Sequence, residues 1–448
     1  MKRLLRRILP AGLLDRYHWA LAMLAGARYG FPAEKMTVIG VTGTNGKSTT
    51  ANLIARILEE AGERVGLTTT VNFKVAEREW LNDTKMTMLG RFRLQGLLAQ
   101  MVRVGCRYAV VETSSEGVKQ SRHAAINYDV AVFTNLTPEH LESHGGFENY
   151  KRAKGQLFRH LMARPRKILG GQPVAKTAVV NLADPHAEYF LGFPAERKIG
   201  FFAAAAGRVV PAAPAGAEML TATAVEISPG GPAFFVDGVR FTLKLPGLFN
   251  VENALAATAA ARAVGVDLAV CARALAKVEV IPGRMEFVNA GQPFRILVDY
   301  APEPESFRKL YEVVRTMRGD GRVIHLLGSC GGGRDRDRRP VLGRLAAENA
   351  DVVIVTNEDP YDDDPAAIIE DVARGAEAAG KVRGQNLLTF LDRGEAIETV
   401  VRLARPGDLV IATGKGAEQA ICVAHGKKIP WDEREKFREA VGKLAGSL

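Results

Sequence analysis

Short apolar runs alternate with longer amphipathic stretches from residue 36 onward. Four of the runs are rich in Val and have the length of buried strands: residues 36–43, 107–114, 129–136 and 177–184. The intervening stretches space their apolar residues as a helix does, for instance in residues 48–62 and 92–105. This alternation predicts an α/β fold with a mostly parallel sheet that helices cover on both faces.

A second series of the same kind begins near residue 294. Its apolar runs are FRILVDYA, RVIHLLGS, ADVVIVTN and GDLVIATG. Just before it, residues 281–293 carry two prolines and two glycines, which favour a hinge. We therefore predict an N-terminal extension (1–35), a central domain (36–284) and a C-terminal Rossmann-like α/β domain (285–448).

Composition and charge narrow the class of protein. The apolar fraction of 47% and the charged fraction of 25% are ordinary for a globular protein. The 4 cysteines lack CxxC spacing, which argues against a disulfide framework or a zinc ribbon and fits a reducing cytoplasm. The net charge of +10 is spread along the chain without an aromatic-basic module, so we expect small anionic substrates such as nucleotides and no nucleic acid.

The first 30 residues begin basic and continue apolar. One proline and three polar residues interrupt the apolar run: Pro10, Asp15, Arg16 and His18. No stretch therefore approaches the roughly 20 apolar residues needed to cross a bilayer. We expect an amphipathic extension packed on the next domain; the alternative is a membrane-surface contact of residues 1–30 through Lys2, Arg3, Arg6 and Arg7.

The segment IGVTGTNGKSTT, residues 39–50, has the order strand, glycine-containing loop, helix. Glycines let successive N–H groups turn toward phosphate oxygens, and the helix N-terminus adds its dipole. Lys47 is placed to reach terminal phosphates, and Ser48 to ligate magnesium. Val41 stands where the common GxxxxGK[ST] pattern has its first glycine, but the context still predicts a phosphate-binding loop in the central domain.

Two more polar residues follow predicted strands. Glu112 directly follows the run YAVV, and His140 lies just past the run at 129–136. In an open parallel sheet, residues at the carboxyl ends of the strands line the ligand crevice. Glu112 is therefore a candidate magnesium ligand, whereas His140 alone favours a structural role.

These motifs, in their order and with their gaps, resemble one family. VTGTNGKSTT, VETSSEGVKQSR, VAVFTNLTPEHLESHG and YKRAKGQLF are similar to the Mur ligases. Further segments look like the MurE type, which adds the third residue to UDP-N-acetylmuramoyl-dipeptide: LPGLFNVENALAA, IPGRMEF, ILVDYAPEP, GSCGGGRDRDRRPVLG, VVIVTNEDPYDDDP, IATGKGAEQ and IPWDERE. The resemblance covers roughly residues 36–440.

The resemblance implies an ATP-dependent ligase that forms a carbon–nitrogen bond in cytoplasmic peptidoglycan synthesis. ATP would phosphorylate a carboxylate of a peptide or muropeptide acceptor, and the amine of an amino acid would attack the acyl phosphate. The central domain would bind ATP and Mg²⁺, and the C-terminal domain would bind the amino acid. Because such a site brings two anions together, cations should dominate its chemistry.

The resemblance also assigns roles to the catalytic and metal-binding residues. Lys47 matches the lysine at the β- and γ-phosphates, and Ser48 with Glu112 matches the first magnesium site. His140 matches the histidine of a second magnesium site. Lys154, in YKRAKGQLF, matches a lysine that carries a CO₂-derived carbamate, an anion that supports magnesium.

Further residues are implied for the nucleotide and the substrates. For ATP they are Gly43, Thr44, Asn45, Gly46, Lys47, Ser48, Thr49, Asn250, Asn253, Arg284 and Asp299. For the acceptor and the amino acid they are Thr87, Ser114, Arg122, Arg339, Glu358, Asp359, Tyr361 and Glu418. Among these, Arg339 matches an arginine that holds the carboxylate of the incoming amino acid.

Several positions depart from the family pattern, mostly on the substrate side. Residues 1–35 are too few for the uridine-nucleotide domain of the MurE type, so a UDP-linked acceptor with its usual anchoring does not follow. Glu116 stands where a histidine is common, and Met88 with Leu89 replaces Thr-Pro. VDYAP and GKGAE lack the usual histidines.

The specificity loop reads EDPY where diaminopimelate-adding relatives read DNPR. Tyr361 cannot pair with a distal carboxylate as an arginine does. The loop is acidic through Glu358, Asp359 and residues 362–364, which favours a cationic amino acid such as lysine. Alternatively, these carboxylates cap a helix that follows at 365–375.

Other functions stay open at this point. A Mur-like ligase outside wall synthesis, of the cyanophycin or another polyamide type, is the first alternative, and a non-catalytic nucleotide-binding partner is the second. The joint presence of Lys47, Glu112, His140 and Lys154 argues against a non-catalytic protein. The sequence does not predict the oligomeric state.

Overall fold

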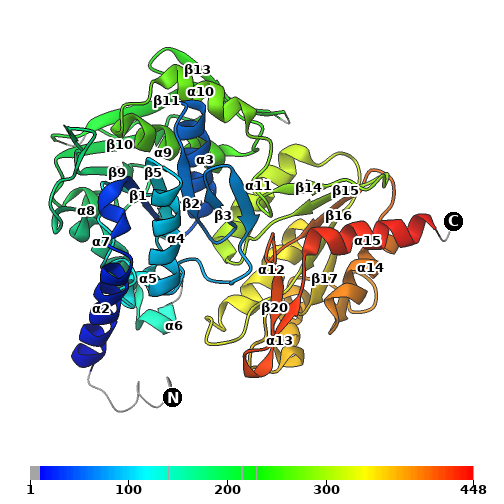
Figure 1. The fold of residues 1–448 in the computed structure, drawn as a ribbon. Helices are drawn as coiled ribbons and strands as arrows, with labels where there is room; N and C mark the ends of the chain where they lie inside the picture. Colours follow the sequence, from blue (N-terminus) through cyan, green and yellow to red (C-terminus); the bar gives the residue numbers. More distant parts are fainter. Residues whose placement is uncertain (1–10, 140, 213–214, 229, 447–448) are drawn as a thin grey trace.

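The computed structural model describes residues 11–139, 141–212, 215–228 and 230–446 (Figure 1). They form two α/β bodies, each with its own sheet and its own apolar clusters. The predicted fold class is therefore confirmed. His140 and the basic cluster Lys2, Arg3, Arg6 and Arg7 lie outside the described residues, so their roles stay predictions.

Within the described residues, the larger body is built on an 11-stranded sheet in the order β13-β12-β11-β10-β9-β6-β1-β5-β2-β3-β4. The strands are β1 (Thr37–Thr42), β2 (Val65–Thr68), β3 (Asn72–Val75), β4 (Arg78–Leu81), β5 (Tyr108–Glu112), β6 (Val130–Phe133), β9 (Thr177–Asn181), β10 (Arg197–Ala203), β11 (Glu218–Ser228), β12 (Gly231–Val236) and β13 (Val239–Thr242). From β11 to β2 all neighbours are parallel, while β12–β13 and β3–β4 add antiparallel edges.

Helices cover both faces of this sheet, as the alternation of apolar runs predicts. The helical elements are α2 (Ala11–Arg28), η1 (Pro32–Lys35), α3 (Lys47–Glu60), α4 (Arg91–Arg103), α5 (Ser115–Lys119), α6 (Leu141–His144), α7 (Phe147–Met162), α8 (Ala187–Leu191), α9 (Leu248–Ala263) and α10 (Leu268–Lys277). A short hairpin, β7 (Ile168–Leu169) and β8 (Gln172–Pro173), completes the body. On β1, Ile39 packs toward α3, α9 and α10, whereas Val38 packs toward α4, α7 and α8, because successive side chains of a strand point to opposite faces.

The smaller body carries a six-stranded sheet in the order β14-β15-β19-β16-β17-β18, parallel except for β14. Its strands are β14 (Glu286–Val288), β15 (Arg295–Val298), β16 (Val323–Leu327), β17 (Val352–Thr356), β18 (Leu387–Phe390) and β19 (Leu409–Ala412), with a separate hairpin of β20 (Ala420–Cys422) and β21 (Lys428–Pro430). Its helices are α11 (Pro304–Met317), α12 (Arg338–Asn349), α13 (Pro365–Ala378), α14 (Arg393–Leu403), the short η2 (Ala424–Gly426) and α15 (Glu433–Ala445). Strand β14 lies inside the predicted hinge, so the second sheet begins within it.

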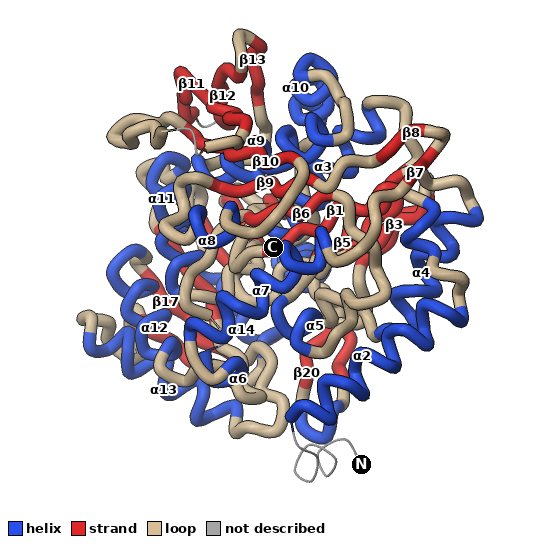
Figure 2. Tube along the Cα trace, turned by 90° about the vertical axis from the view of Figure 1, so that its left-hand side faces the viewer, coloured by secondary structure: helices blue, strands red, loops and turns tan. Residues whose placement is uncertain are grey.

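The described part of the N-terminal extension consists of helix α2 and the short η1, and α2 lies along α4 (Figure 2). Ala22 and Ala25 of α2 are buried, and Arg91 of α4 donates a hydrogen bond to the carbonyl of His18. The expected packing on the next domain is thus confirmed for this helix. Of the helices in the described ranges, none has the length and apolarity required to cross a bilayer.

A buried ion pair holds the loops of the smaller body in place. The Arg393 guanidinium makes three hydrogen bonds to Glu433, at 2.6–3.0 Å, and both side chains are buried. Arg393 also donates to the carbonyls of Asn357 and Thr413, which follow strands β17 and β19. The pair therefore positions the two loops that carry the predicted amino-acid pocket.

We expect Arg393→Leu to lower the free energy of unfolding by about 3–5 kcal/mol, because it leaves the Glu433 carboxylate buried without its cation. Chemical denaturation monitored by circular dichroism measures this. Arg402→Leu, on the exposed face of the same helix, is the matched control and should change the stability by less than about 0.5 kcal/mol. Equal losses in the two variants would contradict the assigned role of the pair.

Candidate functional site

A cavity lies between the two bodies, at the carboxyl ends of the parallel strands of the larger sheet. From the larger body it is lined by the phosphate loop, Glu112, Tyr150 and Lys154, and from the smaller body by Asp299, Ser306, Arg334 and Glu418. Hydrogen bonds cross it: Ser306 of the smaller body donates to Asn45 at 3.0 Å, and Lys85 of the larger body donates to Glu418 at 2.6 Å. Both bodies therefore contribute to one site.

The loop between β1 and α3 has the shape expected of a phosphate-binding loop. Gly46 is the N-cap of α3 with φ 79°, and Gly43 has φ 152°. A side chain on Gly43 would clash with Thr134, and one on Gly46 with Asn253. Both positions therefore need glycine, because of the positive φ and because of the lack of space. The Lys47 ammonium lies over the loop and donates to the Thr44 carbonyl at 2.7 Å.

Ser48 and Glu112 meet beside this loop, as predicted. Ser48 donates to Glu112 at 2.8 Å. Thr70 donates to the same carboxylate through its backbone N–H, at 2.8 Å, and its hydroxyl, at 3.0 Å. A buried carboxylate with neighbouring hydroxyl groups is the kind of oxygen ligand set that Mg²⁺ prefers, so these residues fit the ion.

Lys154 points from α7 into the back of the loop. Its ammonium donates to the Gly43 carbonyl at 2.5 Å and lies 4.4 Å from the centre of the Tyr150 ring. Burial, and then the nearby charge of Lys47, hold the pKa of Lys154 well below its usual value. Loss of a proton from this lysine is thus much easier than from an exposed one.

The four residues predicted for ATP outside the loop also line the cavity. Asn253 donates to Asn250 at 3.0 Å, and the pair lies next to Gly46. The Arg284 guanidinium stacks on the ring of Tyr300 at 4.4 Å. Asp299 is held by the N–H groups of residues 285 and 301, both at 2.7 Å, and its burial raises its pKa.

Most of the predicted substrate residues face the same cavity. From the larger body these are Thr87 and Ser114, and from the smaller body Glu358, Asp359, Tyr361 and Glu418. Arg122 and Arg339 do not line it. Arg122 donates to Gln120 at 2.8 Å and to the Met88 carbonyl, while Arg339 donates to Asp371 at 3.0 Å and lies 3.6 Å from Asp363.

The guanidinium groups that do reach the cavity on this side belong to Arg334 and Arg338. Arg338 pairs with Glu303, whose burial raises the pKa of its carboxyl to about 8. The run RDRDRRP offers four arginines within six residues, and a run of this kind does not reveal which of them point inward. The role predicted for Arg339 stays a prediction, and Arg334 is a stronger candidate for a carboxylate.

Most of the acidic residues in the specificity loop have partners within the protein. Asp364 caps α13 by accepting a hydrogen bond from the N–H of Ala366 at 3.0 Å, which confirms the capping alternative for this residue. Asp362 accepts from the N–H of His425, and Asp363 from that of Gly332. These three carboxylates therefore have structural roles that need no cationic substrate.

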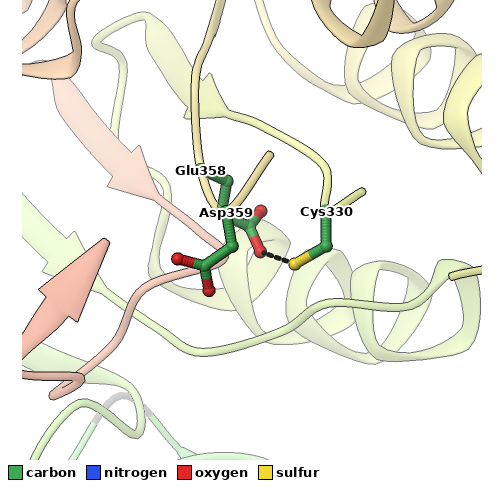
Figure 3. A group of neighbouring side chains, drawn as sticks. All are labelled: Cys330, Glu358 and Asp359. Atoms are coloured by element: carbon green, nitrogen blue, oxygen red, sulfur yellow. Dashed lines mark hydrogen bonds between the residues drawn. The ribbon is translucent and has the colours of Figure 1, made fainter. Parts of the chain in front are cut away.

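Cys330, Glu358 and Asp359 lie close enough together to suggest a metal site (Figure 3). Their contacts argue against one. The Cys330 thiol donates to Glu358 at 2.8 Å, and burial, followed by the Glu358 charge, raises the thiol pKa well above its usual value. Asp359 is paired with Lys415 at 3.0 Å and with Lys85. A metal needs the thiolate and an unpaired carboxylate, so we assign no metal to this group.

Lys85 is a cavity residue that the motifs did not single out. It lies two positions before Thr87, in the loop between β4 and α4, and reaches Asp359 and Glu418 of the smaller body. Its place in the sequence, TKMTM, carries no pattern that sets it apart from a surface lysine. Contacts between residues more than 270 positions apart depend on how the two bodies meet.

Comparisons with known proteins agree with this geometry. Residues 41–261 match the Mur ligase middle domain, and residues 283–416 match the domain described as Mur ligase, glutamate ligase domain. A UDP-N-acetylmuramyl-tripeptide synthetase from Roseiflexus sp. (strain RS-1) is 42% identical over 97% of this chain and 84% of its own length. A UDP-N-acetylmuramoyl-L-alanyl-D-glutamate–2,6-diaminopimelate ligase from Geobacillus thermodenitrificans is 38% identical over 94% of this chain and 82% of its own length.

A solved structure of a ligase with the latter name is 28% identical and has a TM-score of 0.58, covering 92% of this chain and 79% of that one. The two family models together span well over half of the chain, and the sequence relatives align along almost all of it. The chain belongs to the Mur ligase family.

Proposed function

We propose that this chain is an ATP-dependent ligase of the MurE type, which joins an amino acid to a carboxylate of a muramoyl peptide through an acyl phosphate. The two sequence relatives described above are named as a UDP-N-acetylmuramyl-tripeptide synthetase and as a ligase that adds 2,6-diaminopimelate. One observation carries the proposal: a phosphate loop, a candidate magnesium site and polar side chains of the second body share a single cavity. A motor or a switch ATPase needs the loop but not the facing pocket.

The phosphate loop binds the triphosphate of ATP in this proposal. The N–H groups at the start of α3 and the Lys47 ammonium hold the β- and γ-phosphates. Ser48 and Glu112 hold Mg²⁺, which supplies charge neutralisation at the phosphates when bound. The acceptor carboxylate attacks the γ-phosphorus, ADP leaves, and the acyl phosphate that forms is open to the amine of the amino acid.

Lys154 carries a carbamate in this proposal. Carbamate forms when a neutral amine attacks CO₂, with loss of a proton from nitrogen, so a lysine with a lowered pKa is suited to it. The reaction converts a buried cation beside Lys47 into an anion, which removes the repulsion between the two ammonium groups. The carbamate oxygens are then available to support the metal.

Closure of the two bodies protects the acyl phosphate from water. The hydrogen bond from Ser306 to Asn45 links the smaller body to the loop, and Arg284, just before the smaller body begins, donates to Ser48. Water excluded in this way cannot hydrolyse the activated carboxylate before the amine arrives.

The ligase activity is measured as phosphate release from ATP and Mg²⁺, with products identified by mass. We expect release only when an amino acid and an acceptor are both present, with UDP-muramoyl-dipeptide, UDP-muramoyl-tripeptide and a short acidic peptide compared as acceptors. A product from the free peptide alone would move the protein to polyamide synthesis. Phosphate release that is indifferent to every acceptor, without a condensed product, would contradict a ligase.

The carbamate is tested with ¹³C-bicarbonate and Lys154→Arg. We expect a carbamate carbon resonance in the native protein and none in the variant, together with a loss of kcat of about 100-fold or more. Lys151→Arg, one turn earlier on α7 and paired with Glu148 at the surface, is the control and should keep both the resonance and the activity. The same resonance in native protein and Lys154→Arg would place the carbamate elsewhere.

A further inference from the structure

Lys85 carries a positive charge from the larger body into the amino-acid side of the cavity. Its ammonium donates to Glu418 at 2.6 Å and to the Ala420 carbonyl at 3.1 Å, and it pairs with Asp359. The side chain is only 6% exposed. The contact is therefore a desolvated ion pair between the two bodies, in contrast to a surface salt bridge.

Hydrogen bonds hold the loop between β4 and α4 that contains Lys85. Lys85 itself has φ 56°, a conformation that costs a non-glycine residue of order 1 kcal/mol. Asn82 fixes the loop by donating to the Thr69 carbonyl at 2.8 Å and to the Met86 carbonyl at 3.0 Å. Thr84 makes two further hydrogen bonds. Its N–H donates to the Asn82 side chain, and its hydroxyl accepts from the N–H of Met86. The loop is thus held by hydrogen bonds within the larger body, and the Lys85 side chain extends from it to the smaller body.

Two ammonium groups already share the acidic pair Asp359 and Glu418. Lys415 of the smaller body lies 3.0 Å from each carboxylate, and it donates to the Ala420 carbonyl at 2.7 Å. Lys85 contacts the same three acceptors from the other side. Burial alone would lower the pKa of Lys85, but Glu418 and Asp359 raise it above its usual value, so the lysine stays charged.

We propose that Lys85 determines the choice of amino acid: its ammonium fills the cation position between Asp359 and Glu418, so the amino acid presents an uncharged side chain at this end of the cavity. The inference rests on the ligase function proposed above. A substrate ammonium here would be the third cation on two carboxylates, or would have to displace a buried lysine. Asp359, the carboxylate of the specificity loop at this position, therefore does not call for lysine as the substrate.

The test compares two substitutions that both remove the charge but differ in the space they leave. Lys85→Ala opens an ammonium-sized hole beside Asp359 and Glu418, whereas Lys85→Met fills it with an apolar chain. Because both leave the same carboxylates without this cation, any loss of stability is common to the two. Only the alanine variant should accept an ammonium from the substrate.

The measurement is kcat/KM for amino acids paired by length, lysine against norleucine and ornithine against norvaline, which differ only in the terminal ammonium. We expect the native enzyme to favour the uncharged member of each pair. Lys85→Ala should raise the ratio of charged to uncharged substrate by about tenfold or more, the value of one charge-assisted hydrogen bond, and Lys85→Met should not.

Lys428→Ala is the matched control. Lys428 also crosses to the same loop, donating to the Thr84 carbonyl at 3.0 Å, but it is exposed and does not line the cavity. Its removal should leave the substrate ratio unchanged. The proposal is wrong if the native enzyme already favours lysine or ornithine by about tenfold, or if Lys85→Ala has the native ratio.

A binding measurement separates this inference from the ligase function. If the native protein joins no amino acid at all, the proposed function fails, and the cation position is then examined by thermal unfolding with propylammonium chloride. Propylammonium should raise the Tm of Lys85→Ala relative to sodium chloride and leave the native protein and Lys85→Met unchanged. The same response in all three proteins would overturn the role of Lys85.

Discussion

Two anions, the triphosphate of ATP and a substrate carboxylate, must be held in contact for the proposed reaction, and like charges repel strongly in a cavity that excludes water. The cavity is accordingly lined by basic side chains from both bodies, among them Lys47, Lys85, Arg284, Lys309, Arg334 and Arg338. The fold meets this constraint by placing the carboxyl ends of the parallel strands of the larger sheet opposite the loops of the smaller one. Positive charges of the two bodies therefore meet at one cavity.

Several charged groups near the cavity are buried in pairs. Arg393 with Glu433 fixes the loops after β17 and β19, and Lys415 with Asp359 fixes the specificity loop. Each buried pair needs good geometry to offset its loss of hydration. Rigid loops of this kind hold the cavity side chains in position before any substrate binds.

Local sequence patterns predicted most of the fold and roughly half of the residues of the site. The strand and helix periods predicted the two sheets, and the order strand, glycine loop, helix predicted the positions of Lys47 and Ser48. Such patterns could not predict the orientation of Arg339 or the contacts of Lys85. Whether Arg334 or Arg339 faces the cavity depends on how α12 begins, and the contact of Lys85 with Asp359 depends on the packing of two bodies. For a similar reason, the sequence does not show which carboxylates of the acidic loop have partners within the protein.

The most direct measurement of the central claim follows oxygen from the acceptor to phosphate. An acceptor whose reacting carboxylate carries ¹⁸O at both oxygens is incubated with the native protein, ATP, Mg²⁺ and the amino acid, and the released phosphate is analysed by mass. If the carboxylate attacks the γ-phosphorus and the amine then displaces phosphate, one ¹⁸O is carried into each phosphate released. Phosphate without label, formed alongside amide product, would show that ATP does not activate the carboxylate as an acyl phosphate.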